Sequence, residues 1–308
     1  MAFSPTPALN RRAWLALLTG LLAPAAQAQA TDTTWIDSFH LTTSAEVARV
    51  ENISRTSAEP TRKDATTVAV DVAGSIPRQL APSVVLVGSG DLASLFVHDY
   101  ELTNHVTATG RLALQKKFGL GPQAWVLQAS ASGGYKAARL DDDQGFTTEA
   151  GFQLAKRVLT NLRLAASARW LEHDAKSAVF DLNQFTYGLD AQWDINERWT
   201  LSGNASWLQG DIVANAAPAV WAQMLAGDFG PAIFNYYTSR PSGTTDLYGE
   251  GWVSYNVEAD VDLWSVTLTY AWTDQLSLDL RYNAAYVVNK VGVAYPSSAW
   301  ALKANYRF

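Results

Sequence analysis

The chain has 308 residues, a formal net charge of -6 and no cysteine. The acidic balance argues against nucleic acid as a partner, and the lack of thiols excludes disulfides, thiolate metal sites and thiol catalysis. The chain also holds twelve tryptophans and twelve tyrosines, which is many for its length. Such side chains are favoured where a surface is partly apolar and partly hydrated.

The N-terminal segment has the pattern of a secretory signal peptide. Arg11 and Arg12 precede an apolar run from Ala13 to Leu22, which is too short to span a bilayer as a helix. Small residues at 26–28 offer a cleavage site, with 28–30 as a second choice. We therefore expect residues 1–28 to be removed as a signal peptide and residues 29–308 to form a single domain. A buried N-terminal helix is the alternative.

From Phe39 onward, short segments alternate between apolar and polar residues, as strands with one apolar face do. We predict about twelve strands, each about ten residues long or slightly more. Gly88 and Gly90 blur the phase of the third strand. The predicted strands cover residues 39–50, 66–76, 83–97, 105–118, 125–135, 146–158, 162–170, 185–195, 199–207, part of 252–272, 276–288 and 297–308.

The connections between these strands alternate between tight turns and longer loops. Tight turns are predicted at 77–82, 119–122, 160–161, 196–197 and 273–275, and longer loops at 52–63, around 141–145, at 172–183 and at 289–295. A long insertion over Gln209–Glu250 breaks this rhythm and contains a candidate short helix at Ala219–Leu225. The regular alternation of short and long connections predicts an up-and-down order of antiparallel strands.

The last strand carries the most regular pattern. It reads SSAWALKANYRF, and the residues on its apolar face are Trp300, Leu302, Ala304, Tyr306 and Phe308. This ending resembles the terminal strand of Gram-negative outer-membrane β-barrels, whose last residue is usually phenylalanine. The resemblance covers the signal, the alternating body and the terminal strand, and it reaches no narrower family of porins. It implies residence in the bacterial outer membrane and an assembly signal, formed by Trp300, Leu302, Tyr306 and Phe308, that the barrel-assembly machinery recognises.

The fold class predicted is all-β, a transmembrane antiparallel up-and-down β-barrel of about 12 strands, with about 10 to 14 possible. Each unpaired backbone group in hydrocarbon costs several kcal/mol, so an open sheet cannot span a membrane. A soluble β-sandwich also alternates, but tryptophan and tyrosine near the strand ends favour a membrane. With an even strand count both termini and the short turns lie in the periplasm. Glu258, Asp260 and Asp262 share the parity of Trp264, which predicts either a bulge near 263–264 or a strand that projects above the membrane.

If the aromatic faces meet lipid, the polar faces line a lumen. The predicted lumen cations are Arg111, Lys117, Arg157, Arg163, Arg169, Arg281, Lys303 and Arg307. The predicted lumen anions are Glu46, Asp71, Glu149, Asp190, Asp194 and Asp279. The excess of lumen cations over lumen anions predicts a pore whose selectivity follows the charge of its wall. We expect Arg111 and Arg169 to contribute most to a weak preference for anions. The alternative is a lumen filled by neutralising networks of arginine and carboxylate.

Signs of catalysis are weak. The chain has neither an H-E-x-x-H nor a G-x-S-x-G motif, and His173 cannot share a strand face with both Glu172 and Asp174. We therefore expect no enzyme, no cofactor and no metal. The function predicted is a porin-like channel for small hydrophilic solutes, with outer-membrane lipid, lipopolysaccharide and the assembly machinery as partners. Two alternatives stay open: a non-conducting structural or partner-binding barrel, and an outer-membrane lipid hydrolase.

Overall fold

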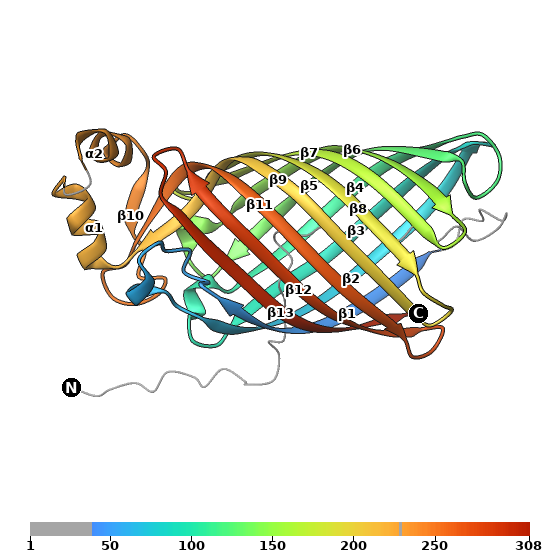
Figure 1. Cartoon of the computed structure of the whole chain (residues 1–308), viewed down its shortest axis with the longest axis horizontal. Helices are drawn as coiled ribbons and strands as arrows, with labels where there is room; N and C mark the ends of the chain where they lie inside the picture. Colours follow the sequence, from blue (N-terminus) through green and yellow to red (C-terminus); the bar gives the residue numbers. More distant parts are fainter. Residues whose placement is uncertain (1–38, 228–229) are drawn as a thin grey trace, which may run out of the picture.

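The computed structural model describes residues 39–227 and 230–308, so the predicted signal peptide lies outside the described residues. Twelve strands form a closed antiparallel wall (Figure 1). They are β1 (His40–Glu51), β2 (Ala65–Ala81), β3 (Val84–Val97), β4 (His105–Phe118), β5 (Trp125–Ala138), β6 (Gly145–Leu159), β7 (Leu162–Ala175), β8 (Leu182–Asp194), β9 (Trp199–Ala216), β11 (Val253–Ala271), β12 (Leu276–Asn289) and β13 (Ala294–Arg307). Consecutive strands pair, and the β13–β1 pair closes the ring. The predicted fold class is therefore confirmed.

The remaining elements lie in the connections. The insertion between β9 and β11 holds α1 (Pro218–Leu225), α2 (Pro231–Thr238) and the short strand β10 (Ser242–Thr244), which extends the edge of β11. Single 3-10 turns lie in three other loops: η1 (Glu59–Thr61), η2 (Glu101–Thr103) and η3 (Asp141–Asp143). None of the helices in the part of the chain that the structure describes is long and apolar enough to cross a membrane.

The alternation along each strand sets the two faces of the wall. On β8, Phe185, Tyr187 and Leu189 are 47%, 48% and 54% exposed and point outward. The residues between them point into the barrel, because neighbouring side chains on a strand face opposite ways. Leu112, Phe152 and Leu302 continue this apolar exterior at 61%, 63% and 59% exposure. A surface of this kind is stable against hydrocarbon and costly against water.

The two ends of the barrel differ. At one end the strands join through tight turns, such as the β4–β5 turn, where Gly119 and Gly121 have φ of 102° and 79° that other residues rarely adopt. Phe308 also lies at this end, where its backbone N–H donates to the carbonyl of Leu41 over 3.0 Å. The opposite end carries the longer loops and both helices (Figure 1). We call these the short-turn end and the long-loop end.

One predicted turn was wrong. The segment 77–82 was expected to turn, but β2 continues through Pro77 to Ala81 and turns only at 82–83. The pairing of β1 with β2 begins at His40 and Ser75, so beyond Ser75 the described part of β2 has only β3 as a neighbour. Proline is tolerated in a strand that has one free side, because no ladder bond is lost there.

The predicted limits of the insertion were also wrong. It was expected to begin at Gln209, but β9 runs on to Ala216 and pairs with β11 up to Val253. The register between Val253 and Ala271 does not shift, so the expected bulge near 263–264 is absent. The acidic residues share the face of Trp264 because β11 is one continuous strand of 19 residues; Asp260 and Asp262 lie within its pairing with β12, and Glu258 lies beyond the end of that pairing at Ala259. The candidate helix is present as α1, whereas α2 and β10 were not predicted.

Candidate functional site: the lumen wall and the long-loop mouth

The structure places the predicted lumen residues on the inward face of the strands. Residues directly opposite each other in neighbouring strands share a face, and Lys303 lies opposite both Glu46 and Asp279. Ser132 likewise lies opposite both Arg111 and Glu149. Lys117 belongs to the same inward set but lies exposed at the short-turn end. The wall therefore combines an apolar exterior with a charged interior.

Arg111 and Arg169 meet at one carboxylate. Arg111 Nη2 lies 2.7 Å from Glu149 Oε1, and Arg169 Nη1 lies 3.6 Å from Glu149 Oε2. The three residues come from β4, β7 and β6, and their side chains are 29%, 24% and 15% exposed. The cluster holds two cations and one anion, so it keeps one net positive charge in the lumen.

Other lumen carboxylates are partnered as well. Arg281 forms a hydrogen-bonded ion pair with Glu46 across β13, and Arg157 lies 3.5 Å from Asp194. Asn204 Nδ2 donates to Asp190 over 2.8 Å, and Asn305 Nδ2 donates to Asp279 over 2.9 Å. These contacts fix the charged side chains against the wall, where they are partly hydrated.

Asp91 is a lumen residue that sequence reasoning missed. It lies on β3 opposite Ala73 and Thr109, on the same inward face as Ala93 and close to Asp71. The glycines of β3 hid the alternation, although Ala93, Leu95 and Val97 continue the same face and could have revealed it. Asp71 and Asp91 give this sector of the wall a negative character.

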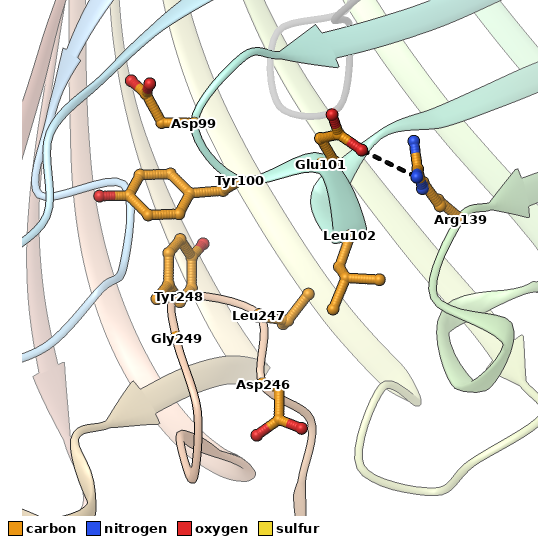
Figure 2. Close-up of a pocket in the computed structure, with 9 residues that line it drawn as sticks. All are labelled: Asp99, Tyr100, Glu101, Leu102, Arg139, Asp246, Leu247, Tyr248 and Gly249. Atoms are coloured by element: carbon orange, nitrogen blue, oxygen red, sulfur yellow. Dashed lines mark ion pairs between the residues drawn. The ribbon is translucent and has the colours of Figure 1, made fainter.

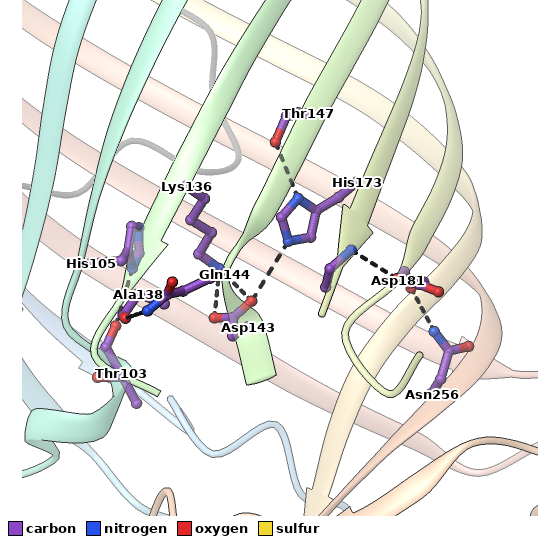
Figure 3. A network of polar contacts seen from close by, with 11 residues as sticks. Thr103, His105, Lys136, Ala138, Asp143, Gln144, Thr147, His173, Asp181 and Asn256 are labelled. Carbon is purple, nitrogen blue, oxygen red and sulfur yellow. Dashed lines mark hydrogen bonds and ion pairs between the residues drawn. The ribbon is translucent and has the colours of Figure 1, made fainter. Parts of the chain in front are cut away.

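A polar network lies on the inner wall at the long-loop end (Figure 3). Lys136 Nζ approaches the two carboxylate oxygens of Asp143 at 2.8 and 2.7 Å. His173, only 5% exposed, lies 3.8 Å from Asp143 through Nε2 and 3.1 Å from Thr147 Oγ1 through Nδ1. Burial raises the pKa of Asp143, but His173 and the ion pair with Lys136 outweigh burial and hold that pKa below its ordinary value. The network ties the η3 loop to the wall.

The partners of His173 differ from its sequence neighbours. Glu172 and Asp174 are exposed on the outer face of β7, as the alternation requires. The contacts of His173 instead come from the η3 loop and from β6, which sequence spacing could not reveal. Its distance of 3.8 Å from Asp143 is too long for a hydrogen bond, so the set does not form an oriented acid–base pair. Within residues 39–227 and 230–308, no group of three or more potential ligands could hold a metal ion.

A first apolar cluster covers the inward face of the β9–β11 ribbon at the long-loop end. We call it the helix cluster, and its buried members are Leu208, Ile212, Ala214, Ala216, Met224, Tyr237, Tyr255, Val257, Ala259, Val261, Val287 and Tyr295. Tyr237 of α2 is 1% exposed, its ring centroid lies 5.3 Å from that of Tyr255, and its hydroxyl accepts from Asn289 Nδ2 over 2.8 Å. The helices are thereby fixed to β11 and β12.

A second cluster joins the loops to the end of the ribbon. We call it the loop cluster, and its buried members are Val179, Phe180, Ala217, Leu247, Tyr248 and Trp252. Tyr248 is central: its ring centroid lies 5.1 Å from that of Tyr100 and 5.5 Å from that of Trp252, and its hydroxyl donates to the carbonyl of Ile53 over 2.8 Å. Burial raises the pKa of Tyr248 to about 12. Figure 2 shows Tyr100 and Tyr248 next to each other, with ring planes inclined at 64°, beside a pocket of about 360 Å³.

A buried chain of hydrogen bonds strengthens this junction. Thr245 Oγ1 and Ser254 Oγ are 2.6 Å apart, Ser254 Oγ donates to Asn215 Oδ1 over 2.7 Å, and Asn215 Nδ2 donates to the carbonyl of Ser54 over 2.9 Å. The last bond joins β9 to the β1–β2 loop, 161 residues away. The end of the ribbon is thus buried on both faces, and the two clusters form a packed cap at the long-loop end.

Comparison with known proteins identifies the fold. No known protein family matches the chain, and no curated protein matches it in sequence. An outer-membrane channel from Pseudomonas putida F1 superposes with a TM-score of 0.53, over 90% of this chain and 100% of that one, at 9% identity. The fold is that of outer-membrane β-barrels. Outer-membrane phospholipase A from Escherichia coli matches at a TM-score of 0.46 and 11% identity, over 86% of this chain and 95% of that one. At such identities the likeness extends to the fold alone.

Proposed function

We propose that this protein is an outer-membrane channel for small hydrophilic solutes with a weak preference for anions. The observation that carries the proposal is the two-sided wall, with an apolar exterior suited to lipid and a charged interior suited to water and ions. Charges are costly to bury unless they are hydrated or paired, and the cluster of Arg111, Arg169 and Glu149 holds one cation more than it holds anions, which an aqueous lumen would hydrate. The fold shared with a Pseudomonas channel supports the same proposal.

The anion preference rests on the shared carboxylate. Glu149 neutralises one of its two arginines, so the cluster retains one positive charge in a low-dielectric wall, and Asp91, which interacts with Arg111, offsets part of that field and keeps the preference weak. The reversal potential in a KCl gradient should indicate weak anion selectivity. Arg111→Glu combined with Arg169→Glu should shift it toward cations. A cation-selective wild type, or a reversal potential that the double variant leaves unchanged, would contradict this assignment.

The cap makes conduction depend on the long-loop end. Its packed loops would have to be displaced for solutes to pass, so the wild type should open rarely in a planar bilayer. Ala216 and Val253 lie directly opposite each other, so a two-residue Asn-Gly turn can replace residues 217–252. This shortened variant should conduct in steady single-channel steps. Tyr248→Ala combined with Trp252→Ala is a milder version, and Leu120→Ala in the exposed β4–β5 turn is the control.

The outcomes separate the alternatives. If the wild type, the shortened variant and the Tyr248/Trp252 variant are all folded yet silent, the protein is a non-conducting barrel and the proposal fails. Release of fatty acid from a supplied phospholipid by the wild type would instead favour a hydrolase. Conduction by the shortened variant, with no such release, supports the channel.

We also infer that the barrel resides in the outer membrane with the short-turn end in the periplasm, as short turns and long outer loops suggest. Phe308 is 67% exposed on the lipid face, and its ring centroid lies 4.8 Å from that of Tyr306. The assembly machinery would meet this aromatic end. Deleting Phe308 should reduce folded protein in the outer membrane, whereas Phe308→Trp should not. Equal amounts of heat-modifiable protein from both variants would contradict the role of the terminal residue.

A further inference from the structure

Cationic side chains lie over exposed aromatic rings on the outer surface of the short-turn end. Lys116 Nζ lies 5.2 Å from the ring centroid of Phe118, and Lys156 Nζ lies 5.0 Å from that of Trp125. Phe118 and Trp125 are 46% and 45% exposed. These contacts are not part of the lumen, because Lys116 and Lys156 share the outward parity of Leu114 and Leu154.

The four residues form one continuous patch. Phe118 and Trp125 lie directly opposite each other in the β4–β5 pair, and Trp125 extends toward Lys156 on β6. The two lysines therefore flank a pair of aromatic rings across three neighbouring strands. We call this patch the lysine–aromatic rim. Leu120, 98% exposed in the adjoining turn, adds an exposed apolar side chain at the same edge.

A second group of the same chemistry lies further around the same end. Arg198 Nη1 lies 3.5 Å from the hydroxyl of Tyr270, whose ring centroid is 4.7 Å from that of Trp199. Trp272 is 62% exposed beside them. Cations paired with interfacial aromatic residues thus recur on strands far apart in the ring, so the feature belongs to this end of the barrel rather than to one turn.

Two strands carry acidic residues on their outer faces at the long-loop end. Glu172 and Asp174 are exposed on β7, and Glu258, Asp260 and Asp262 follow one another on the outer face of β11. Arg240 and Lys290 pair with Glu258 and Asp260, but Glu172 and Asp174 have no cation within ion-pair distance among the described residues. Acidic side chains therefore gather on the outer faces of β7 and β11 at the long-loop end, whereas the two lysines of the rim lie at the short-turn end.

We propose that the lysine–aromatic rim binds anionic phospholipid headgroups of the periplasmic leaflet. The proposal rests on the orientation given under the proposed function. Tryptophan and phenylalanine occupy the headgroup boundary, while lysine side chains extend their charge toward phosphate at the surface. An anionic surface attracts each nearby lysine, and this attraction strengthens binding roughly fivefold for each lysine. Two lysines on one patch should favour an anionic lipid over a zwitterionic one by about 25-fold.

The test measures lipid retention on the whole folded chain. The protein is refolded in detergent with equal amounts of phosphatidylglycerol and phosphatidylcholine, and the lipids that remain bound are counted by native mass spectrometry. The wild type should retain phosphatidylglycerol preferentially. Lys116→Gln combined with Lys156→Gln should abolish most of that preference, and Lys116→Arg combined with Lys156→Arg should preserve it.

Lys117→Gln is the matched control, because Lys117 is the next residue along β4 and faces the lumen. It should leave lipid retention unchanged. The proposal is overturned if the double glutamine variant, folded by heat-modifiable mobility, retains phosphatidylglycerol as the wild type does, or if Lys117→Gln loses as much. Since the readout is lipid retention, a channel that conducts normally while showing no lipid preference would reject the rim and leave the proposed function standing.

Discussion

The barrel wall and the cap shield their apolar side chains from water in different ways. In the wall each strand has one face for lipid and one for the lumen, so residues such as Leu189 and Asp190 alternate with period two. In the cap the end of the β9–β11 ribbon is buried on both faces, with Tyr255 in the helix cluster and Trp252 in the loop cluster. The wall thus depends on its solvent, whereas the cap has a core like that of a soluble protein.

This difference predicts separate stabilities. The wall is held by a closed ladder of backbone hydrogen bonds that persists while lipid surrounds it. The cap is held by side-chain packing and a few buried hydrogen bonds, which single substitutions can remove. Variants in the two regions should therefore fail in different ways.

The largest effect is expected in the cap. Tyr237→Ala removes a side chain that is 1% exposed together with its hydrogen bond to Asn289, and truncation of a buried aromatic residue costs about 3–5 kcal/mol. Hydrogen exchange should rise in α1 and α2 while the wall stays folded by gel mobility. Phe234→Ala, on the same helix but at a side chain 36% exposed, is the control with a smaller effect. Unfolding of the whole barrel by Tyr237→Ala would show that the two regions are not separate.

The next effect tests the two faces of the wall. Leu189→Arg puts a charge on the lipid face and should cost about 2–4 kcal/mol near the membrane midplane. Gln192→Arg puts the same charge in the lumen, where Asp194 lies within reach of Gln192 at 3.2 Å, and should cost almost nothing. Urea unfolding in lipid vesicles measures both. Equal destabilisation by the two variants would mean that the faces are assigned incorrectly.

An intermediate effect is expected where the wall meets the loops. The pKa of Asp143 lies below its ordinary value of about 4, so its ion pair stabilises the η3 loop above that pH and is lost as pH falls through the lower, folded-state value. Asp143→Asn should weaken the loop by about 1–3 kcal/mol at neutral pH and remove its response to acid. Hydrogen exchange of the η3 loop at neutral pH and near pH 3 tests both statements.

Asp142→Asn is the matched control for this change, because Asp142 is the adjacent exposed residue of η3. It should leave the acid response intact. A loop that loosens in acid to the same degree with and without the Asp143 carboxylate would assign the response to another group, such as the nearby His105, whose pKa burial lowers to about 4.

The smallest effect is expected in the lumen. Glu149→Gln frees both Arg111 and Arg169 from their shared partner and should move the reversal potential slightly toward anions. The shift should shrink as salt rises, because screening acts over about 10 Å at 0.1 M. Glu59→Gln, with a side chain 84% exposed in the η1 loop, should change nothing. A larger shift from Glu59→Gln would place the selectivity in the loops.

The sequence predicted the strands correctly where the pattern of neighbouring residues was regular. The alternation from His105 to Phe118 gave the bounds of β4, and the glycines at 119 and 121 marked its turn. The prediction failed at Asp91, where glycines hide the alternation, and at residues 209–216, where Gly210 and the apolar run from Ile212 to Ala214 interrupt the alternation. The period-two rule assumes that apolar residues mark the buried face, whereas this end of the ribbon buries polar residues such as Asn215 and Ser254 as well.

The sequence by itself determined the closed barrel, its antiparallel order and which residues face outward. These follow from side chains that alternate every second residue and from connections that alternate in length, and both are properties of neighbouring residues. Only the tertiary structure decided that Arg111 and Arg169 share Glu149, that His173 lies beside Asp143, and that Asn215 reaches Ser54. Those contacts depend on the register of non-adjacent strands and on the packing of loops up to 161 residues apart, and no local pattern of residues encodes either.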